Sequence, residues 1–137
     1  MMGKLQSPPR FAGYAALFDI ADAAKDIITP GAFARSLSKR AAGLPVFWQH
    51  RPEQVIGTIE KIAEDARGLR VIGRLDNPAS RASELLRRGA VNGLSFGYRA
   101  RSYRKTARGR ILDEIELFEV SIVTHPLQHG SRVQFVI

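Results

Sequence analysis

Three residues of this sequence have the types and surroundings needed to cleave a peptide bond by nucleophilic attack: a serine, a histidine and a glutamate. Ser95 lies in Gly93-Leu-Ser-Phe-Gly97, which matches the G-x-S-x-G pattern of a nucleophile elbow. That elbow needs a strand before the serine and a helix after it, whereas we expect a helix before Ser95 and a strand after it. The match is therefore coincidental in fold, but small flanking residues leave the hydroxyl open to a carbonyl group.

His50 is the candidate general base. It follows the apolar residues Phe47 and Trp48, and Arg51-Pro52 is expected to end the strand just after it. A histidine at the mouth of an apolar strand is well placed to be half-buried and aimed at a neighbour. The alternative interpretation is an ordinary surface histidine at a strand end.

Glu119 is the candidate third member, inside the apolar run from Leu117 to Thr124. A carboxylate in such a strand is costly unless it has a partner, and an imidazole N–H is one. Glu114 and Glu116 share the strand, so an ion pair with a neighbouring basic segment is the alternative for all three carboxylates.

A metal or cofactor site is not expected. The chain has no cysteine, which excludes thiolate ligands and disulfides. His125 and His129 are four residues apart, but Pro126 and Gly130 argue against a helix that would align them. No glycine-rich phosphate loop is present either.

The elements that must position these residues are mostly strands. Thr29-Pro30 and Asn77-Pro78 each open a helix, since a capping side chain precedes a proline at the first helical position, and Gly89 ends the second. The result is an α+β fold, a β-rich barrel-like domain flanked by short helices, because closure removes exposed strand edges. We expect a flexible leader over 1–10 and a single domain over 11–137. Strands are expected over 11–18, 44–48, 55–62, 69–75, 94–103, 111–124 and 132–137.

Charge suggests partners. The 137 residues carry a net charge of +8 with 45% hydrophobic residues, an ordinary globular balance. Six cations fall within the segment 99–110, which is either a solvated hairpin or a contact for an acidic protein or nucleic acid. We see no signal peptide and no apolar run long enough for a membrane helix, so we expect a soluble intracellular protein.

Several segments together resemble the prohead maturation proteases of tailed phages, in the version found in gene transfer agents. The resemblance covers roughly residues 11–135. Its motifs are Leu44-Pro-Val-Phe-Trp-Gln-His50, Gly89-Ala-Val-Asn-Gly-Leu-Ser-Phe-Gly-Tyr98 and Phe118-Glu-Val-Ser-Ile-Val-Thr-His-Pro126, with Gly13-Tyr-Ala-Ala-Leu-Phe18 and Ile28-Thr-Pro-Gly-Ala-Phe33 in support.

The resemblance implies a fold like that of the herpesvirus assemblin proteases, with a serine nucleophile and a histidine base. The position that matches the second histidine of those enzymes holds Glu119, with His125 as the other candidate. It also implies oxyanion donors from backbone N–H groups in the turn after Thr124, where Gln128 and Arg132 are weak substitutes for an arginine pair.

The same resemblance implies a partner and a place of action. The substrate would be the scaffold or the scaffolding segment of the major capsid protein, together with the protease's own chain, inside the procapsid in the host cytoplasm. Homodimerisation stays open. The alternative is a non-catalytic assembly or scaffold-binding protein of the same fold.

Overall fold

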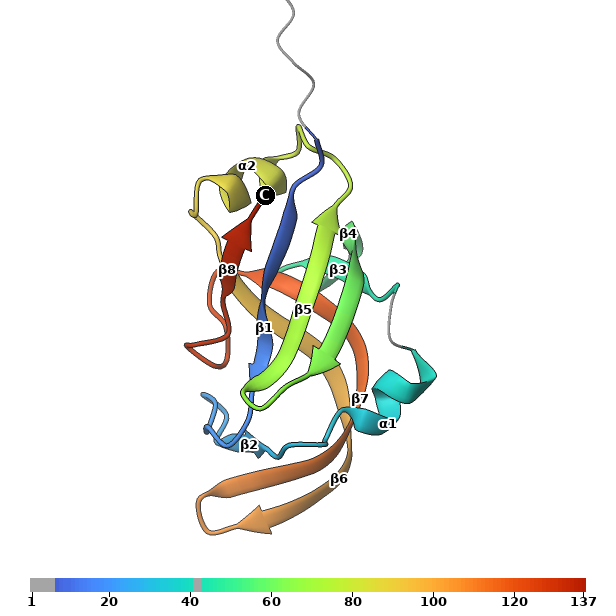
Figure 1. The fold of residues 1–137 in the computed structure, drawn as a ribbon. Coiled ribbons are helices and arrows are strands. Elements are labelled where there is room, and N and C mark those ends of the chain that lie inside the picture. Colours follow the sequence, from blue (N-terminus) through green and yellow to red (C-terminus); the bar gives the residue numbers. More distant parts are fainter. Residues whose placement is uncertain (1–6, 41–42) are drawn as a thin grey trace, which may run out of the picture.

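The computed structural model describes residues 7–40 and 43–137. Within those residues the chain forms a β-rich fold with two short helices (Figure 1). In chain order the elements are β1 (Arg10–Leu17), β2 (Asp26–Ile28), α1 (Ala34–Lys39), β3 (Pro45–Trp48), β4 (Arg51–Glu64), β5 (Gly68–Leu75), α2 (Arg81–Arg87), β6 (Gly93–Thr106), β7 (Gly109–Val123) and β8 (Val133–Val136).

Strand β7 organises the sheet. β6 pairs with it antiparallel along its whole length, while β2 and β3 both pair with it parallel, at different points along its other edge. The sheet then continues through β4, β5 and β1 to β8. An isolated bridge between Gly93 and Arg132 links the start of β6 to the chain just before β8. The fold is therefore barrel-like as expected, but the sheet is not closed into a barrel, and β8 stays at its edge.

The buried apolar side chains form one core cluster. Strand residues from several elements contribute side chains that are almost fully buried, because the alternate positions of each strand share a face. Phe33, which precedes α1, is fully buried and packs edge-on against Phe96 of β6, with 5.4 Å between the ring centroids. The largest fully buried side chains include Phe11, Ile28, Leu44, Ile59, Leu69, Leu75, Leu86, Leu94, Leu112, Ile115 and Ile122.

The predicted start of the first helix was wrong. Residues 30–33 form turns, and α1 begins only at Ala34. Thr29 does not cap the helix, since its hydroxyl donates to Leu112 O at 3.2 Å. The carboxylate of Glu64 instead accepts the Gly31 and Phe33 N–H groups at 2.8 Å each. The carboxylate of Glu64, distant in sequence, thus binds the N–H groups that Thr29 was expected to cap.

The second helix begins later than predicted and ends as expected. Ser80 is its N-cap and accepts the Ser83 N–H, so Asn77-Pro78 lies in the turn before it. Gly89 has a φ of +70°, the left-handed conformation that favours glycine after a helix.

The strand predictions missed one element and several boundaries. β2, only three residues long, was not predicted. β4 begins at Arg51, because a tight turn rather than a strand end follows Trp48. β6 and β7 run on into a long hairpin whose far end projects beyond the rest of the sheet (Figure 1).

The division into a leader over 1–10 and one domain over 11–137 stays a prediction. Residues 1–6 lie outside the described residues, and Arg10 already belongs to β1. No helix in the described ranges is long and apolar enough to cross a membrane.

Candidate active site

One face of the β6–β7 pair carries two of the three predicted site residues. Ser95 lies directly opposite Ser121, and Gly97 lies directly opposite Glu119. Residues directly opposite each other in an antiparallel pair point to the same side of the sheet, as do residues two apart along a strand. The hydroxyl of Ser95 and the carboxylate of Glu119 therefore share a face, away from the core that Leu94 and Phe96 enter.

A bulge in β7 aims Glu119 at that face. Gly97 pairs with Glu119, but Tyr98 pairs with Leu117, so Phe118 is an extra residue on β7. Leu117 and Val120 can therefore both face the core, although they are three residues apart. Bulges often re-aim a side chain beside an active site. Without this one, Glu119 would share the inward face of Leu117.

Gly97 makes room for the Glu119 side chain. A Cβ atom built at Gly97 would lie 2.8 Å from Glu119 Cγ and in contact with its carboxylate. A Cβ built at Gly93 would meet Pro126 Cδ at 2.8 Å. Each glycine thus has a packing reason of its own, and the sequence interpretation that both keep Ser95 open stays a prediction.

His50 lies in the two-residue turn between β3 and β4. Trp48 pairs with Arg51 across the turn, and Gln49 and His50 have φ angles of +52° and +60°. These are the angles of a type I′ hairpin turn, which normally takes glycine, asparagine or aspartate. A non-glycine residue in this region costs of order 1–3 kcal/mol, so contacts outside the turn must hold it.

Those contacts all come from β7 and the residue after it. Gln49 N–H donates to Ile122 O at 3.0 Å, and its side chain exchanges two hydrogen bonds with Thr124, at 2.6 and 3.1 Å. His50 N–H donates to the Ser121 hydroxyl at 3.2 Å. The turn is thereby fixed along the strand that also carries Glu119.

The imidazole of His50 is bound to Glu119. Nδ1 lies 2.7 Å from Glu119 Oε1, and the Ser121 hydroxyl donates to Glu119 Oε2 at 2.6 Å. The Glu119 side chain is only 7% exposed, while that of His50 is 43% exposed. A buried carboxylate fixes the ring through Nδ1, which leaves Nε2 as the nitrogen that can take a proton from a nucleophile.

Ser95 is buried to 5% exposure and borders a small cavity of about 10 Å³. Leu127, Gln128 and Ser131 from the turn after Thr124 line the same cavity. No described residue forms a hydrogen bond with the Ser95 hydroxyl, and none joins it to His50. Nucleophile–base hydrogen bonds are often long without substrate, and here His50 is related to Ser95 through Glu119, which shares the face of Ser95 and binds the His50 ring.

The remaining candidates lie elsewhere. The side chain of His125 is exposed and forms no hydrogen bond or ion pair with another described residue, and His129 contacts Arg132. Gln128 is buried and binds both the N–H and the C=O of Leu17. Arg132 is held by His129 O and Asn92. Both proposed oxyanion substitutes are thus occupied by structural bonds, and no three potential metal ligands come together in the described ranges.

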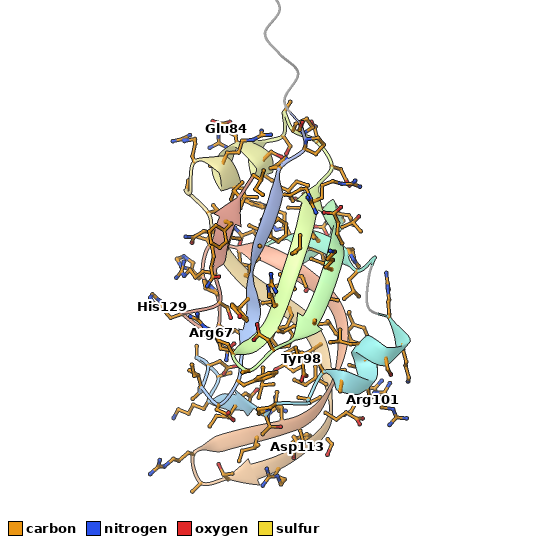
Figure 2. The ribbon with its side chains drawn as sticks, in the orientation of Figure 1. Arg67, Glu84, Tyr98, Arg101, Asp113 and His129 are labelled. Atoms are coloured by element: carbon orange, nitrogen blue, oxygen red, sulfur yellow. The ribbon has the colours of Figure 1, made fainter. Side chains whose placement is uncertain are left out.

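The basic segment lies on the projecting part of the hairpin, and half of its cations are paired. Arg101 binds Glu116 at 2.7 Å, Arg104 binds Asp113 at 3.0 Å, and Arg110 binds Asp26 through two bonds. Figure 2 shows Arg101 and Asp113 on this part of the molecule. The hydrogen bonds from Arg110 hold the pKa of the buried Asp26 carboxyl below its usual range, although burial opposes them.

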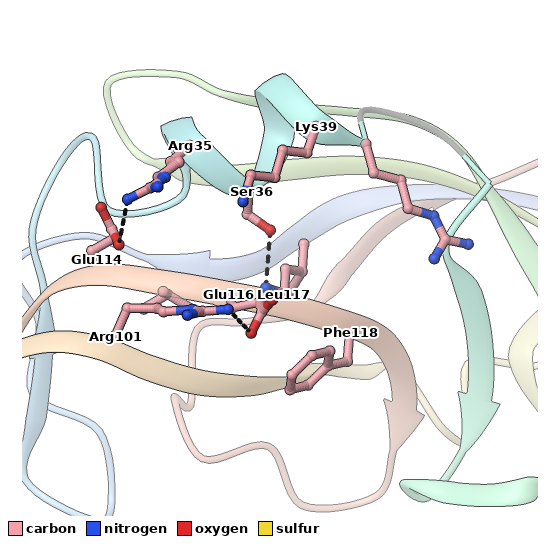
Figure 3. A pocket seen from close by; sticks show the side chains of 10 residues that line it. Arg35, Ser36, Lys39, Arg101, Glu114, Glu116, Leu117 and Phe118 are labelled. Atoms are coloured by element: carbon pink, nitrogen blue, oxygen red, sulfur yellow. Dashed lines mark hydrogen bonds and ion pairs between the residues drawn. The ribbon is translucent and has the colours of Figure 1, made fainter.

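A groove of about 270 Å³ lies between α1 and β7 (Figure 3). It contains the Arg35–Glu114 and Arg101–Glu116 pairs and the half-exposed Phe118. None of His50, Ser95 and Glu119 lines it. The groove is therefore separate from the candidate active site.

Comparison with solved structures identifies the fold. The bacteriophage T4 capsid assembly protease gp21 matches with a TM-score of 0.66 at 15% identity, over 83% of this chain and 80% of that one. The KSHV protease bound to a hexapeptide phosphonate inhibitor matches with a TM-score of 0.61 at 13% identity, over 96% of this chain and 65% of that one. Varicella-zoster virus protease gives 0.60 at 20% identity, over 93% and 64%. At these identities the likeness shows the assemblin-like fold alone.

Comparison of sequences identifies the family. The prohead protease of Enterobacteria phage HK97 is 36% identical over 130 residues, which cover 90% of this chain. The match spans 58% of the length of that relative. The family described as caudovirus prohead serine protease matches residues 4–137. The chain therefore belongs to the caudovirus prohead serine protease family.

Proposed function

We propose that this chain is a serine endopeptidase with Ser95 as nucleophile, His50 as general base and Glu119 as the residue that orients the base. The observation that carries the proposal is the 2.7 Å bond between His50 Nδ1 and the buried Glu119, on the same face of the sheet as Ser95. A nucleophile, a base and an orienting acid on one face form the arrangement that acyl-transfer enzymes share.

The proposed mechanism follows from these positions. Ser95 Oγ attacks the carbonyl carbon of the peptide bond, and His50 Nε2 takes the hydroxyl proton. The resulting imidazolium then returns that proton to the leaving amine. Glu119 keeps the proton on Nδ1 and stabilises the imidazolium, and water resolves the acyl-enzyme in a second round of the same steps.

The oxyanion needs donors close to Ser95. The turn after Thr124 supports this role, because its Leu127, Gln128 and Ser131 border the cavity beside Ser95. We assign the donors to main-chain N–H groups of this turn other than that of Ser131, which already donates to Gln128 O, since the Gln128 and Arg132 side chains also bind other groups.

We infer the substrate from the family. The HK97 relative is named a prohead protease, and the T4 neighbour is named a capsid assembly protease. The proposed substrates of this chain are the scaffold or scaffolding segment of the major capsid protein and its own chain. It would act inside the procapsid in the host cell.

The test uses a serine-directed fluorophosphonate probe and a processing assay. The probe should label the chain at Ser95, and co-expression with the cognate capsid protein should give cleaved products by intact mass. Ser95→Ala should lose both results and keep its circular dichroism spectrum. The matched control is Ser102→Ala, an exposed serine on the same strand, which should change neither. Processing by Ser95→Ala at the wild-type rate would refute the protease and favour a non-catalytic assembly protein.

A further inference from the structure

We propose that Ser121 is a positioning residue that holds the general base in place, a role that rests on the proposed function. Its hydroxyl joins the main chain of His50 to the carboxylate that binds the His50 ring. Ser121 does not touch the reacting atoms. It acts through His50 and Glu119.

The hydrogen bonds around Ser121 leave little freedom. Ser121 is fully buried, and one hydroxyl can donate once while accepting another bond. It accepts the His50 N–H and donates to Glu119 Oε2, while Glu119 Oε1 binds His50 Nδ1. The ring of His50 is therefore bound to the Glu119 carboxylate directly, and its main chain is bound to the same carboxylate through Ser121. This fixes the direction of Nε2.

The turn needs such a fixed point. Gln49 and His50 both occupy the left-handed region without being glycine, so the turn does not favour this conformation by itself. The Gln49 side chain also holds the turn, but its partner Thr124 is exposed, and water can replace those bonds. Ser121 holds the turn through a fully buried hydroxyl, beside the Gln49 N–H bond to the carbonyl of the buried Ile122, and a hydrogen bond to a buried group costs more to lose than one that water can replace.

A purely structural role is the alternative, because any buried serine needs partners. Ser83 provides a matched comparison within the same chain. It is also fully buried, and its hydroxyl donates to Asn77 O at 2.6 Å, but it lies in α2 with no contact to the His50 turn. Loss of either hydroxyl removes a buried hydrogen bond, and only loss of that of Ser121 should move His50.

The experiment compares Ser121→Ala, Ser121→Cys and Ser121→Thr with Ser83→Ala. Steady-state cleavage of a fluorogenic peptide that spans the mapped processing site gives kcat and KM. The ¹⁵N chemical shifts of the His50 ring report which nitrogen carries the proton. Ser121→Ala and Ser121→Cys should lower kcat about 10- to 100-fold with KM changed less than about threefold, since the lost contact orients the base and not the substrate. The Nδ1–H form of the ring should lose population in both.

Ser121→Thr keeps the hydroxyl but adds a methyl group, so it separates hydrogen bonding from packing. If the hydroxyl positions His50, Thr should retain more kcat and more Nδ1–H form than Ala and Cys. Ser83→Ala should leave both readouts unchanged. Wild-type ring signals and kcat in Ser121→Ala, or in Ser121→Cys should Ala fail to fold, would overturn the proposal.

The ring signals also separate this proposal from the proposed function. A chain that cleaves no peptide still has a His50 ring whose proton position can be measured. Loss of the Nδ1–H form in Ser121→Ala without any wild-type activity would uphold the positioning role and reject the protease.

Discussion

The two halves of the β6–β7 hairpin share one ladder of backbone hydrogen bonds but differ in burial and in the side chains that they carry. The inner half, residues 93–98 with 117–123, is buried against β3 and carries Ser95, Glu119 and Ser121 on its outward face. The outer half, residues 99–106 with 109–116, pairs with only the three residues of β2; its β6 side is exposed over 101–106, while Leu112 and Ile115 on its β7 side are buried. Its polar residues are mostly long and charged, whereas those of the inner half are small or fully bound.

The difference shows how burial changes the meaning of a carboxylate. Glu116 in the outer half pairs with an exposed arginine, where water screens both charges and the bond contributes little. Glu119, three residues later, is buried and bound to a histidine and a serine. The same residue type on the same strand is a surface ion-pair partner in one half and the proposed orienting group in the other.

The largest expected effect is at His50 in the inner half. His50→Ala should lower peptide cleavage on the order of 10⁴-fold or more, about as much as Ser95→Ala, because in the proposed mechanism the two residues act as one unit. The double variant should be little worse than either single variant. Cleavage rates that multiply across the two substitutions would show that His50 and Ser95 act independently.

Glu119→Gln should come next. The amide keeps the shape of the side chain but removes the charge that stabilises the imidazolium, so we expect a loss of at least about a hundredfold in kcat. His125→Asn should cost less than about tenfold, since that side chain is exposed and outside the hydrogen-bonded set. Both rates should be measured on one peptide with folding checked by circular dichroism. A more severe defect in His125→Asn would make His125 the third member and Glu119 structural.

Gly97→Ala should displace the carboxylate without changing any catalytic residue. The added Cβ would lie against Glu119 Cγ and its carboxylate, so the side chain must move away from His50. We expect a loss of about 10- to 100-fold in kcat, the scale of a small misplacement of a positioned group. The control is Gly130→Ala, whose Cβ would meet only the flexible end of Leu17. An equal loss of kcat in Gly97→Ala and Gly130→Ala would show that Gly97 has no specific role in placing the Glu119 carboxylate.

Much of the inner half could be predicted from sequence. Ser95 and Glu119 stand out because a polar residue in an apolar strand needs a reason, and His50 stands out because an apolar strand leads to it. Ser121 follows the same logic and was missed, although it is two residues from Glu119 and must share its face. The alternation of side chains along the strand is the signal that could have identified Ser121.

The rest could not be predicted, because it depends on contacts between distant segments. Nothing in Gln49-His50 favours a type I′ turn, since the bonds that hold it come from Ser121, Ile122 and Thr124. The first helix start was wrong because Glu64, about thirty residues away, binds the N–H groups that Thr29 was expected to cap. β2 has only three residues, too few for a periodic pattern.

Asp26 tests what anchors the outer half. Its folded-state pKa is lowered by the hydrogen bonds from Arg110, so the pair stabilises the fold above the unfolded pKa of about 3.9 and loses that effect as pH falls through the folded value. Asp26→Asn should therefore reduce the free energy of unfolding by about 1–3 kcal/mol at neutral pH. The gap from wild type should shrink below about pH 4 in urea titrations. Asp113→Asn, at an exposed pair, should change the free energy of unfolding little. A difference in stability between Asp26→Asn and wild type that does not vary with pH would contradict a stabilising ion pair between Asp26 and Arg110.

The smallest effect on chemistry should come from the tip of the outer half. Lys105 and Arg108 form no ion pair with another described residue, unlike Arg104 beside them. Reversing both to Glu should leave cleavage of a short peptide within about twofold, because the tip is far along the ladder from Ser95. Association with the acidic scaffold segment or with duplex DNA should weaken, and more at low salt than at high salt, since exposed charges are screened within about 10 Å at 0.1 M salt.

Arg104→Glu is the control for this comparison. It removes an existing ion pair with Asp113 and places two carboxylates together, so it perturbs the hairpin itself. The substitutions at Lys105 and Arg108 change only the charge of the exposed surface. If reversal at Lys105 and Arg108 abolishes peptide cleavage, the tip belongs to the active site and the two halves of the hairpin are not separate in function. If peptide cleavage persists and partner binding falls, the hairpin divides as its burial indicates, with chemistry in the inner half and recognition in the outer half.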